Sequence, residues 1–537
     1  MHHRRIPIAL ALLAAPTLVG CNAHPIEPIC YQHYAESTTE VSLESQRKVD
    51  ILFVIDNSGS MGEEQAALAA NFQAFVGALE AEDVDADYRI GITTTDDGNP
   101  WCQGTGPESG KLQLRSCRDH IGDFVFSPGS SSEIDRRAVA CEERCPEDLA
   151  GLTTLATATD LDPEARARPW LQRGNGLSNV PEGVSTAEAL ACWGPQGING
   201  CGYESPLESM RKAVTLSGQG GADSYGFLRD DALLQVVFIT DEADCSAGPG
   251  SAAAFDPNGS RALWPDPDAP LPPSALCWNA GVSCTTGDDG RTRCEPAELN
   301  AEGQPAADGE EVLHPLSRYI EVLDAIDQHK RNVIGQDSPQ VLVSVIAGVP
   351  TEYAGQDLDY GPGSDPAFEA DFGVGAGCSS GNGQAVPPVR LRAMADAFAD
   401  EPGTNLFSIC DEDYSPALEA IADILIERLR PSCIDACVAG VADLEQGKLD
   451  ACTIVQDDGS ASREVVPCEQ ASDGSYQRPD GEDLCVHAVT AEDMHEDCQA
   501  DGRNVELRFV RAPGVGYGNV TATCEISATP QLDCPAG

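Results

Sequence analysis

One segment near the N-terminus joins an apolar run to a polar turn. It reads Lys48-Val49-Asp50-Ile51-Leu52-Phe53-Val54-Ile55-Asp56-Asn57-Ser58-Gly59-Ser60. Residues 48–55 are mostly β-branched or aromatic, which is typical of a strand buried on both faces of a parallel sheet. From Glu63 to Glu80 apolar residues recur at helical spacing, with acidic residues in the first turn. The segment therefore predicts a β-loop-α unit whose polar turn follows the carboxyl end of the strand.

The same alternation of buried strands and amphipathic helices continues along the chain. Further apolar runs of strand length are Tyr88–Thr94, Leu233–Thr240, Val341–Ala347 and Asn405–Ile409. Helical patterns lie at Pro206–Val214, Pro315–Gln328 and Pro416–Leu429, each opening near a proline, which the first helical turn accepts. Alternating strands and helices imply a parallel sheet covered on both faces. We therefore expect a doubly wound, Rossmann-like α/β domain with a mostly parallel sheet over residues 48–430.

Three long segments rich in Gly, Pro and Cys interrupt this pattern. They span about residues 97–200, 244–312 and 351–388, and their cysteines predict insertions held by disulfides on the α/β core. After the last helical pattern the alternation stops, and residues 431–537 carry eight cysteines with strand-like stretches at Asn504–Val510 and Val520–Ile526. We expect a small, mainly β, Cys-rich C-terminal domain.

The overall charge and the cysteine content limit the kinds of partner and the compartment. The chain has 87 acidic against 33 basic residues and a formal net charge of −54. Nucleic acids and anionic membrane surfaces require basic patches, so both are excluded as expected partners. The 22 cysteines favour an oxidising compartment, because a reducing cytosol would leave them as free thiols.

The N-terminus carries the features of an export signal. Arg4 and Arg5 precede a short apolar run, which over residues 1–20 is typical of a signal peptide and too short to span a membrane. Leu18-Val19-Gly20-Cys21 resembles the lipobox of bacterial lipoproteins, which implies a lipid on Cys21 and a place in the cell envelope, at the periplasmic or surface face of the outer membrane. An ordinary signal peptide is the alternative. Residues 21–47 are polar and predict a tether.

The polar turn after the first strand places oxygen donors at alternate positions. Asp56, Ser58 and Ser60 follow the strand directly, and a second acidic loop, Thr240 to Asp244, follows a later strand. Ligands of doubly wound sheets bind at the carboxyl ends of the strands, and Mg²⁺ favours a few protein oxygens together with water. The two loops therefore predict a cation site. A helix cap with serine turns is the alternative, since Asp and Ser commonly serve that role. Asp96 and Asp97, after the Tyr88–Thr94 run, are assigned to a surface turn.

The Asp-x-Ser-x-Ser motif, with Thr240-Asp241 after a later strand, resembles the metal-ion-dependent adhesion site of the von Willebrand factor type A (VWA) domain. The resemblance covers about residues 48–430 and implies a bound Mg²⁺, or Mn²⁺ or Ca²⁺ in its place. By position, the implied ligands are Asp56, Ser58, Ser60 and Asp241. The family adds a threonine from the loop before an intermediate helix and leaves one position open for a carboxylate of the protein ligand. This chain has no threonine in that loop, so Glu204 or Ser205 would take its place.

The resemblance favours an exported, lipid-anchored binding or adhesion protein that recognises a protein or surface partner. The alternative is a disulfide-stapled structural protein of the envelope in which the metal is only structural. No enzyme is expected, because the chain has no His-Glu-x-x-His pair and Gly377-Cys378-Ser379-Ser380-Gly381 lies in a Gly-rich loop without the strand and helix of a nucleophile elbow. A catalytic site within the insertions is the remaining option.

Overall fold

The computed structural model describes residues 38–42, 48–441 and 451–534, apart from gaps at 82–83, 85, 103, 128–132, 175–176, 335–337, 382, 430–431, 435, 458–461, 472–473, 480, 491–493, 495–497, 499–502, 512–518, 529 and 531–533. The predicted signal peptide, Cys21 and most of the predicted tether lie outside these residues. Among the helices that are described, none combines the length and the apolar character needed to cross a membrane.

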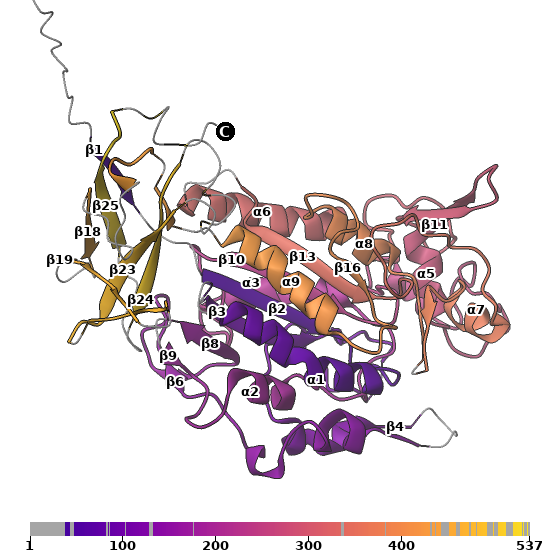
Figure 1. The fold of residues 1–537 in the computed structure, drawn as a ribbon. Helices are drawn as coiled ribbons and strands as arrows, with labels where there is room; N and C mark the ends of the chain where they lie inside the picture. The colour runs from indigo at the N-terminus through magenta and orange to yellow at the C-terminus, as the bar shows by residue number, and fades with distance from the viewer. Residues whose placement is uncertain are drawn as a thin grey trace, which may run out of the picture.

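A seven-stranded sheet forms the centre of the described α/β region (Figure 1). Its parallel strands are β2 (Lys48–Ile55), β3 (Asp87–Thr94), β10 (Leu233–Ile239), β13 (Val341–Ala347) and β16 (Leu406–Ser408). The spatial order is β16-β13-β10-β2-β3, continued by β8 and β9. The mostly parallel sheet predicted from the apolar runs is confirmed, and the predicted strands match the observed ones to within two residues at each end.

Helices cover both faces of this sheet because the strands are apolar on both sides. In β2, Phe53 and its alternate neighbours pack with α1 (Gly62–Leu79) and α9 (Ser415–Arg428), whereas Leu52 and Val54 face the other side. That second side is covered by α3 (Pro206–Ser217), α6 (Ser317–Ile334) and α8 (Val389–Asp396). The sheet therefore separates two apolar cores, as expected for a strand sequence without polar alternation.

The segment predicted as the first insertion contributes to the sheet itself. Two short strands, β8 (Trp170–Gly174) and β9 (Leu177–Ser178), extend the sheet beyond β3 in antiparallel fashion. The segment also forms α2 (Thr186–Trp193), whose N-terminus carries a capping box between Ser185 and Glu188. The central sheet is therefore larger than expected and has an antiparallel edge. The segment also contains the short strand pairs β4 (Val125–Phe126) with β5 (Ile134–Asp135) and β6 (Ala156–Thr157) with β7 (Arg166–Ala167). Its short helical turns are η1 (Cys117–Phe124), η2 (Arg137–Glu142) and η3 (Glu147–Leu149).

The other two insertions fold into small units of their own. The second contains α4 (Ser251–Phe255), α5 (Ala275–Gly281) and a hairpin of β11 (Val282–Thr286) and β12 (Thr292–Pro296) that projects from the molecule in Figure 1. The third contains α7 (Pro366–Phe372), β14 (Cys378–Ser379) and β15 (Gln384–Ala385). Their long irregular loops are held by disulfides, as predicted.

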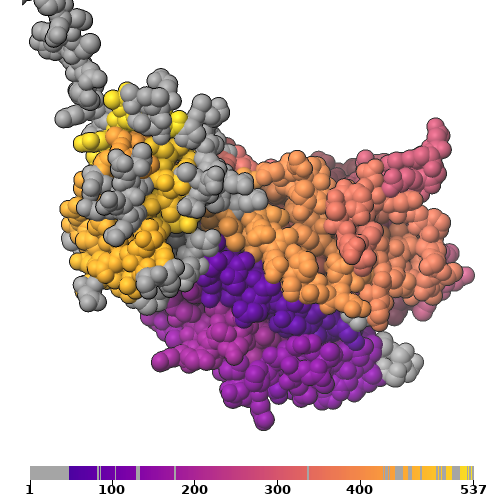
Figure 2. Space-filling view, viewed as in Figure 1, coloured from indigo at the N-terminus to yellow at the C-terminus, as the bar shows by residue number. Residues whose placement is uncertain are grey.

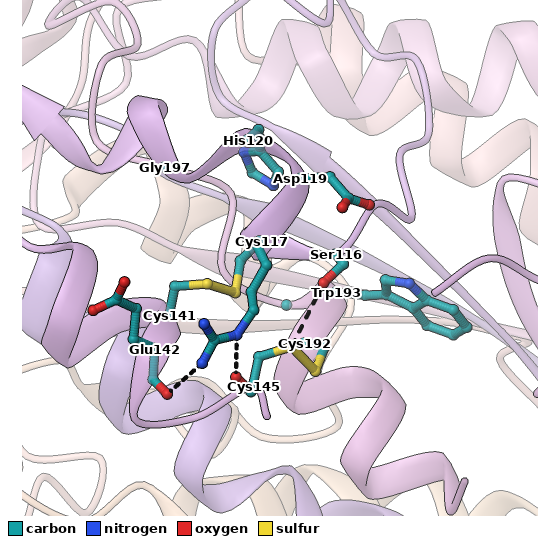
Figure 3. Close-up of a disulfide and its surroundings, with 12 residues drawn as sticks. Ser116, Cys117, Asp119, His120, Cys141, Glu142, Cys145, Cys192, Trp193 and Gly197 are labelled. Atoms are coloured by element: carbon teal, nitrogen blue, oxygen red, sulfur yellow. Dashed lines mark hydrogen bonds between the residues drawn. A yellow bond between two sulfur atoms is a disulfide. The ribbon is translucent and has the colours of Figure 1, made fainter. Parts of the chain in front are cut away.

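Ten disulfides link the described cysteines, which are all the cysteines of the chain except Cys21 and Cys30. Figure 3 shows two of them, Cys117–Cys141 and Cys145–Cys192, which staple the first insertion together and to α2. The eight cysteines of residues 431–537 pair among themselves, as an even set predicts.

The C-terminal region is built from β-strands around a separate apolar core. One sheet has the order β1-β25-β18-β19 and a second has the order β17-β24-β23-β20. Its strands are β17 (Ser432–Cys433), β18 (Cys452–Asp457), β19 (Ser462–Glu464), β20 (Val466–Pro467), β21 (Glu469–Gln470), β22 (Tyr476–Gln477), β23 (Leu484–Val489), β24 (Glu506–Arg511) and β25 (Asn519–Glu525). The region forms a lobe beside the α/β domain in Figure 2. A Cys-rich, mainly β region is therefore confirmed.

This β domain includes a strand from the segment predicted as a tether. β1 (Thr38–Ser42) pairs antiparallel with β25, with Thr38 opposite Glu525 and Ser42 opposite Thr521. Ser42 and Lys48, and likewise Arg428 and Ser432, are close in sequence, and the β domain lies at the end of the central sheet where β2 begins (Figure 1). The α/β domain is thus inserted between the first strand and the rest of the β domain.

Because β1 is an edge strand of the β domain, a chain that starts at residue 43 is expected to have a weakened C-terminal sheet. The five cross-strand pairs, at about 0.2–1 kcal/mol each, predict a loss of about 1–5 kcal/mol. Hydrogen exchange of the β25 amides measures it, and the control is a chain that starts at residue 37 or earlier. Equal protection of β25 in both chains would show that β1 is dispensable.

Candidate functional site

The predicted site residues lie where the strand order of the central sheet reverses. β2 is followed in sequence by β3 on one side, whereas β10 lies on its other side, so the carboxyl ends of β2 and β10 border the crevice in which open α/β sheets bind ligands. Asp56 follows β2 and Asp241 follows β10, and the backbone N–H of Asp56 donates to Ile239 O at 2.9 Å. The structure therefore brings the two predicted loops together.

The motif loop does not cap the helix that follows it. Helix α1 has Met61 at its N-cap, and no side chain caps it. Instead the Ser58 N–H donates to Asp56 Oδ1 at 2.7 Å, and the Ser58 and Ser60 hydroxyl oxygens lie 3.2 Å apart. The capping alternative is therefore not supported, and the two hydroxyls converge as a pair of cation ligands would.

The loop after β10 completes this cluster. The Thr240 hydroxyl donates to Asp56 Oδ2, and Asp241 is only 7% exposed. Ser60 lies within hydrogen-bonding reach of Asp241, whose Oδ1 is buried and accepts no hydrogen bond from any described residue. An anionic oxygen in this state has lost its water and gained no donor, which is costly unless a cation or a proton compensates.

Glu204 joins the same cluster from the loop before α3. It is fully buried, its Oε2 accepts the Thr95 hydroxyl, and its Oε1 has no hydrogen-bond partner among the described residues. Ser205, the other candidate for the missing threonine, donates its hydroxyl to the Cys245 carbonyl at 3.1 Å. The geometry therefore favours Glu204 over Ser205.

The carboxylates of the cluster raise one another's pKa. Burial is the largest cause for Asp56, Asp241, Glu204 and Glu242. The charge of Asp56 adds to the effect and raises the pKa of Asp241 and Glu204 further. Burial likewise raises the pKa of Glu64 to about 7, with contributions from Glu63 and Asp56. We call this end of the sheet, with the loops that carry Asp56–Ser60, Thr95, Glu204 and Asp241, the pole. It gathers negative charge, and no described cationic side chain hydrogen-bonds to Asp241 or Glu204.

The donor set fits a small hard cation. Two hydroxyls and up to three carboxylates are oxygen ligands of the kind that Mg²⁺, Mn²⁺ and Ca²⁺ take, and the unpartnered oxygens of Asp241 and Glu204 are the feature that such an ion would satisfy. Among the described residues, no three His, Cys, Asp or Glu side chains are arranged to hold a metal by themselves, so the serine hydroxyls are essential to the assignment.

Two residues of the pole were not singled out from the sequence. Thr95 follows a buried strand at the same edge, a signal that could have identified it. Gln65 bridges the motif loop, donating to Asp56 O at 2.8 Å and to Gly197 O at 2.7 Å, and no local pattern indicates this. The assignment of Asp96 to a surface turn is wrong, because Asp96 is 1% exposed. Asp244 pairs with Arg390 at 2.9 Å, a structural role.

No family model and no curated protein matches this chain. Among solved structures it matches the pilus adhesin SpaC from Lactobacillus rhamnosus GG in an open conformation, with a TM-score of 0.29 and 9% identity over 90% of this chain and 40% of that one. It also matches the pilus adhesin RrgA from Streptococcus pneumoniae, with a TM-score of 0.26 and 11% identity over 91% of this chain and 57% of that one. The chain thus spans only part of these adhesins, and scores this low support no inference about function.

Proposed function

We propose that this chain is an exported, non-enzymatic binding protein whose VWA-like domain holds a divalent cation at the pole of the sheet. The ligands are Asp56, Ser58, Ser60 and Asp241, with Glu204 as the fifth. The ion is Mg²⁺, or Mn²⁺ or Ca²⁺ in its place, and it would hold together the loops that form the pole. The organised pole would then contact a protein or cell-surface partner.

The observation that carries this proposal is the pair of buried, unpartnered carboxylate oxygens beside the two serine hydroxyls. They lie where open α/β sheets bind ligands, and the resemblance of the motif to the adhesion site supplies Asp241 and the two serines as ligands.

The proposal also places the chain in the bacterial cell envelope. A lipid on Cys21 would anchor it at the outer membrane, on the periplasmic or surface face, and the disulfides are consistent with an oxidising compartment. Because the β domain includes β1, it would lie on the anchored side, with the cation site at the far ends of the strands. That arrangement suits a protein that presents its pole to a partner.

A second candidate function is that of a structural envelope protein in which the ion only organises the loops. The observation that favours it is the buried Glu204, because a carboxylate in place of the family's threonine adds negative charge at the ion and weakens its attraction for a partner's carboxylate.

The test is thermal unfolding with chelator and with saturating Mg²⁺ or Mn²⁺. The melting temperature of the wild type is expected to rise with the ion by several degrees, as binding to the native state alone dictates, whereas Asp56→Ala is expected to show no rise. Asp423→Ala, at an exposed position on α9, is the matched control and should respond like the wild type. An absence of any shift in the wild type would end the metal proposal.

Partner binding requires a separate measurement. Capture from envelope extracts with and without chelator distinguishes the two functions, because a partner that depends on the organised pole is lost in chelator. A chain that captures no protein under either condition would favour the structural candidate.

A further inference from the structure

Glu204 is held in place through both its side chain and its backbone. Its Oε2 accepts the Thr95 hydroxyl, and its carbonyl accepts the Cys245 N–H at 2.6 Å. The next residue, Ser205, donates its N–H to Thr95 O at 3.0 Å. Side chain and backbone are therefore held together, so that Glu204 is not a surface residue that could turn away to admit another group.

Disulfides hold the two flanking loops as well. Cys102–Cys201 ties the loop after β3 to the loop that carries Glu204, and Cys245–Cys277 ties the loop after β10 to α5. The backbone therefore has little freedom to shift the position of Glu204 relative to Asp56 and Asp241. A loop rearrangement that would exchange Glu204 for a ligand from outside is opposed by two covalent links.

The site also offers little access from outside. Asp56 and Glu204 are fully buried, and Ser58 and Asp241 are at most 7% exposed. The ring of Phe126, from β4, packs on the motif loop so closely that a Cβ placed on Gly59 would lie 2.4 Å from it. Only Ser60 among the site residues is exposed. A carboxylate side chain of another protein would have to displace these groups to reach the cluster.

The charge of the site also opposes the entry of a carboxylate from another protein. When Asp56, Asp241 and Glu204 are ionised, the negative charge of these protein ligands already exceeds the positive charge of a divalent cation. The two unpartnered, buried oxygens, Asp241 Oδ1 and Glu204 Oε1, are those that an ion would satisfy first. A further carboxylate would add repulsion in a buried environment, where the screening by water is weak.

We propose that Glu204 is a permanent ligand that completes the cation site from within the chain, so that no partner carboxylate enters it. This rests on the cation site of the proposed function. Glu204 thereby determines that no outside carboxylate binds at the ion. The ion holds the loops together, and any partner is recognised by the protein surface around the pole rather than through the metal.

The experiment uses Mn²⁺ alone as the probe with the full-length mature protein, and compares the wild type, Glu204→Thr and Glu108→Gln. Free Mn²⁺ measured by electron paramagnetic resonance gives the affinity, and water proton relaxation reports the exchangeable water on bound Mn²⁺. Glu108 is a suitable control because it is a half-buried carboxylate of the same pole whose Oε2 accepts the Thr94 hydroxyl.

Glu204→Thr is expected to bind Mn²⁺ roughly tenfold more weakly, or worse, and to show higher relaxation per bound ion, because water replaces the lost carboxylate. Acetate should lower that relaxation in Glu204→Thr and leave it unchanged in the wild type and in Glu108→Gln. Equal affinity and relaxation in the wild type and Glu204→Thr, or an acetate effect in the wild type, would overturn the inference while the cation site stands. Failure of every variant to bind Mn²⁺ would instead remove the proposed function.

Discussion

Replacing Arg229 with methionine is expected to lower the free energy of unfolding by about 3–5 kcal/mol, because it leaves two buried carboxylates without their cation. The Arg229 guanidinium pairs with Asp50 Oδ1 at 2.8 Å and with Asp87 Oδ1 at 2.6 Å, and the Arg229 N–H also donates to Asp50. Asp50 is fully buried and Asp87 is 5% exposed. Urea unfolding monitored by tryptophan fluorescence gives the change.

Two controls separate the loss of charge pairing from the loss of side-chain packing. Arg137→Met removes an exposed arginine that pairs with the exposed Asp135 and is expected to change the stability little. The triple variant Arg229→Met, Asp50→Asn, Asp87→Asn removes the whole ion cluster and is expected to recover part of the loss. If Arg229→Met is as stable as the wild type, Arg229 does not stabilise the two carboxylates of Asp50 and Asp87.

The parallel sheet could be predicted because its strands are continuous apolar runs, and such runs indicate burial on both faces wherever they occur. The edge strands β8 and β9 could not, because each is short and mixed in character: Trp170 and Leu171 are followed by three polar or small residues. The pairing of β8 with β3 also depends on a partner distant in sequence. Strand β1 could not be predicted for the same reason, since its residues 38–42 are polar except for Val41 and pair with residues near the C-terminus.

The candidate site could be predicted to the extent that its residues stand directly after buried strands, because the carboxyl ends of parallel strands meet at one edge. Asp56 and Asp241 come together in this way. What the sequence could not supply is the support for Glu204: its hydrogen bond from Thr95 and the disulfide Cys102–Cys201 join segments that are about a hundred residues apart. Such contacts follow from the fold and leave no local pattern.

The second large effect concerns the charge of the site, and its expected sign depends on the cation. Asp241→Asn should raise the melting temperature in chelator and lower it, relative to the wild type, in saturating Mg²⁺. Without an ion, burial and the charges of Asp56 and Glu64 hold the pKa of Asp241 well above its usual value. An acid whose pKa is raised in the folded state stabilises that state below its unfolded pKa and loses this contribution as the pH rises through the folded pKa.

The chelated wild type should therefore lose stability between about pH 4.5 and pH 7, the interval bounded for Glu64 by its ordinary pKa and by the raised value of about 7. Asp241→Asn removes one of the buried acids whose ionisation opposes folding, so it is expected to recover part of this stability at neutral pH in chelator. Mg²⁺ at about a hundred times its dissociation constant would stabilise the wild type by about 2.7 kcal/mol and the variant far less. Melting curves of the wild type and Asp241→Asn at pH 5 and pH 7.5, with and without the ion, give the melting temperatures that test these expectations. If Asp241→Asn and the wild type differ by the same amount in chelator and in Mg²⁺, Asp241 does not bind the cation.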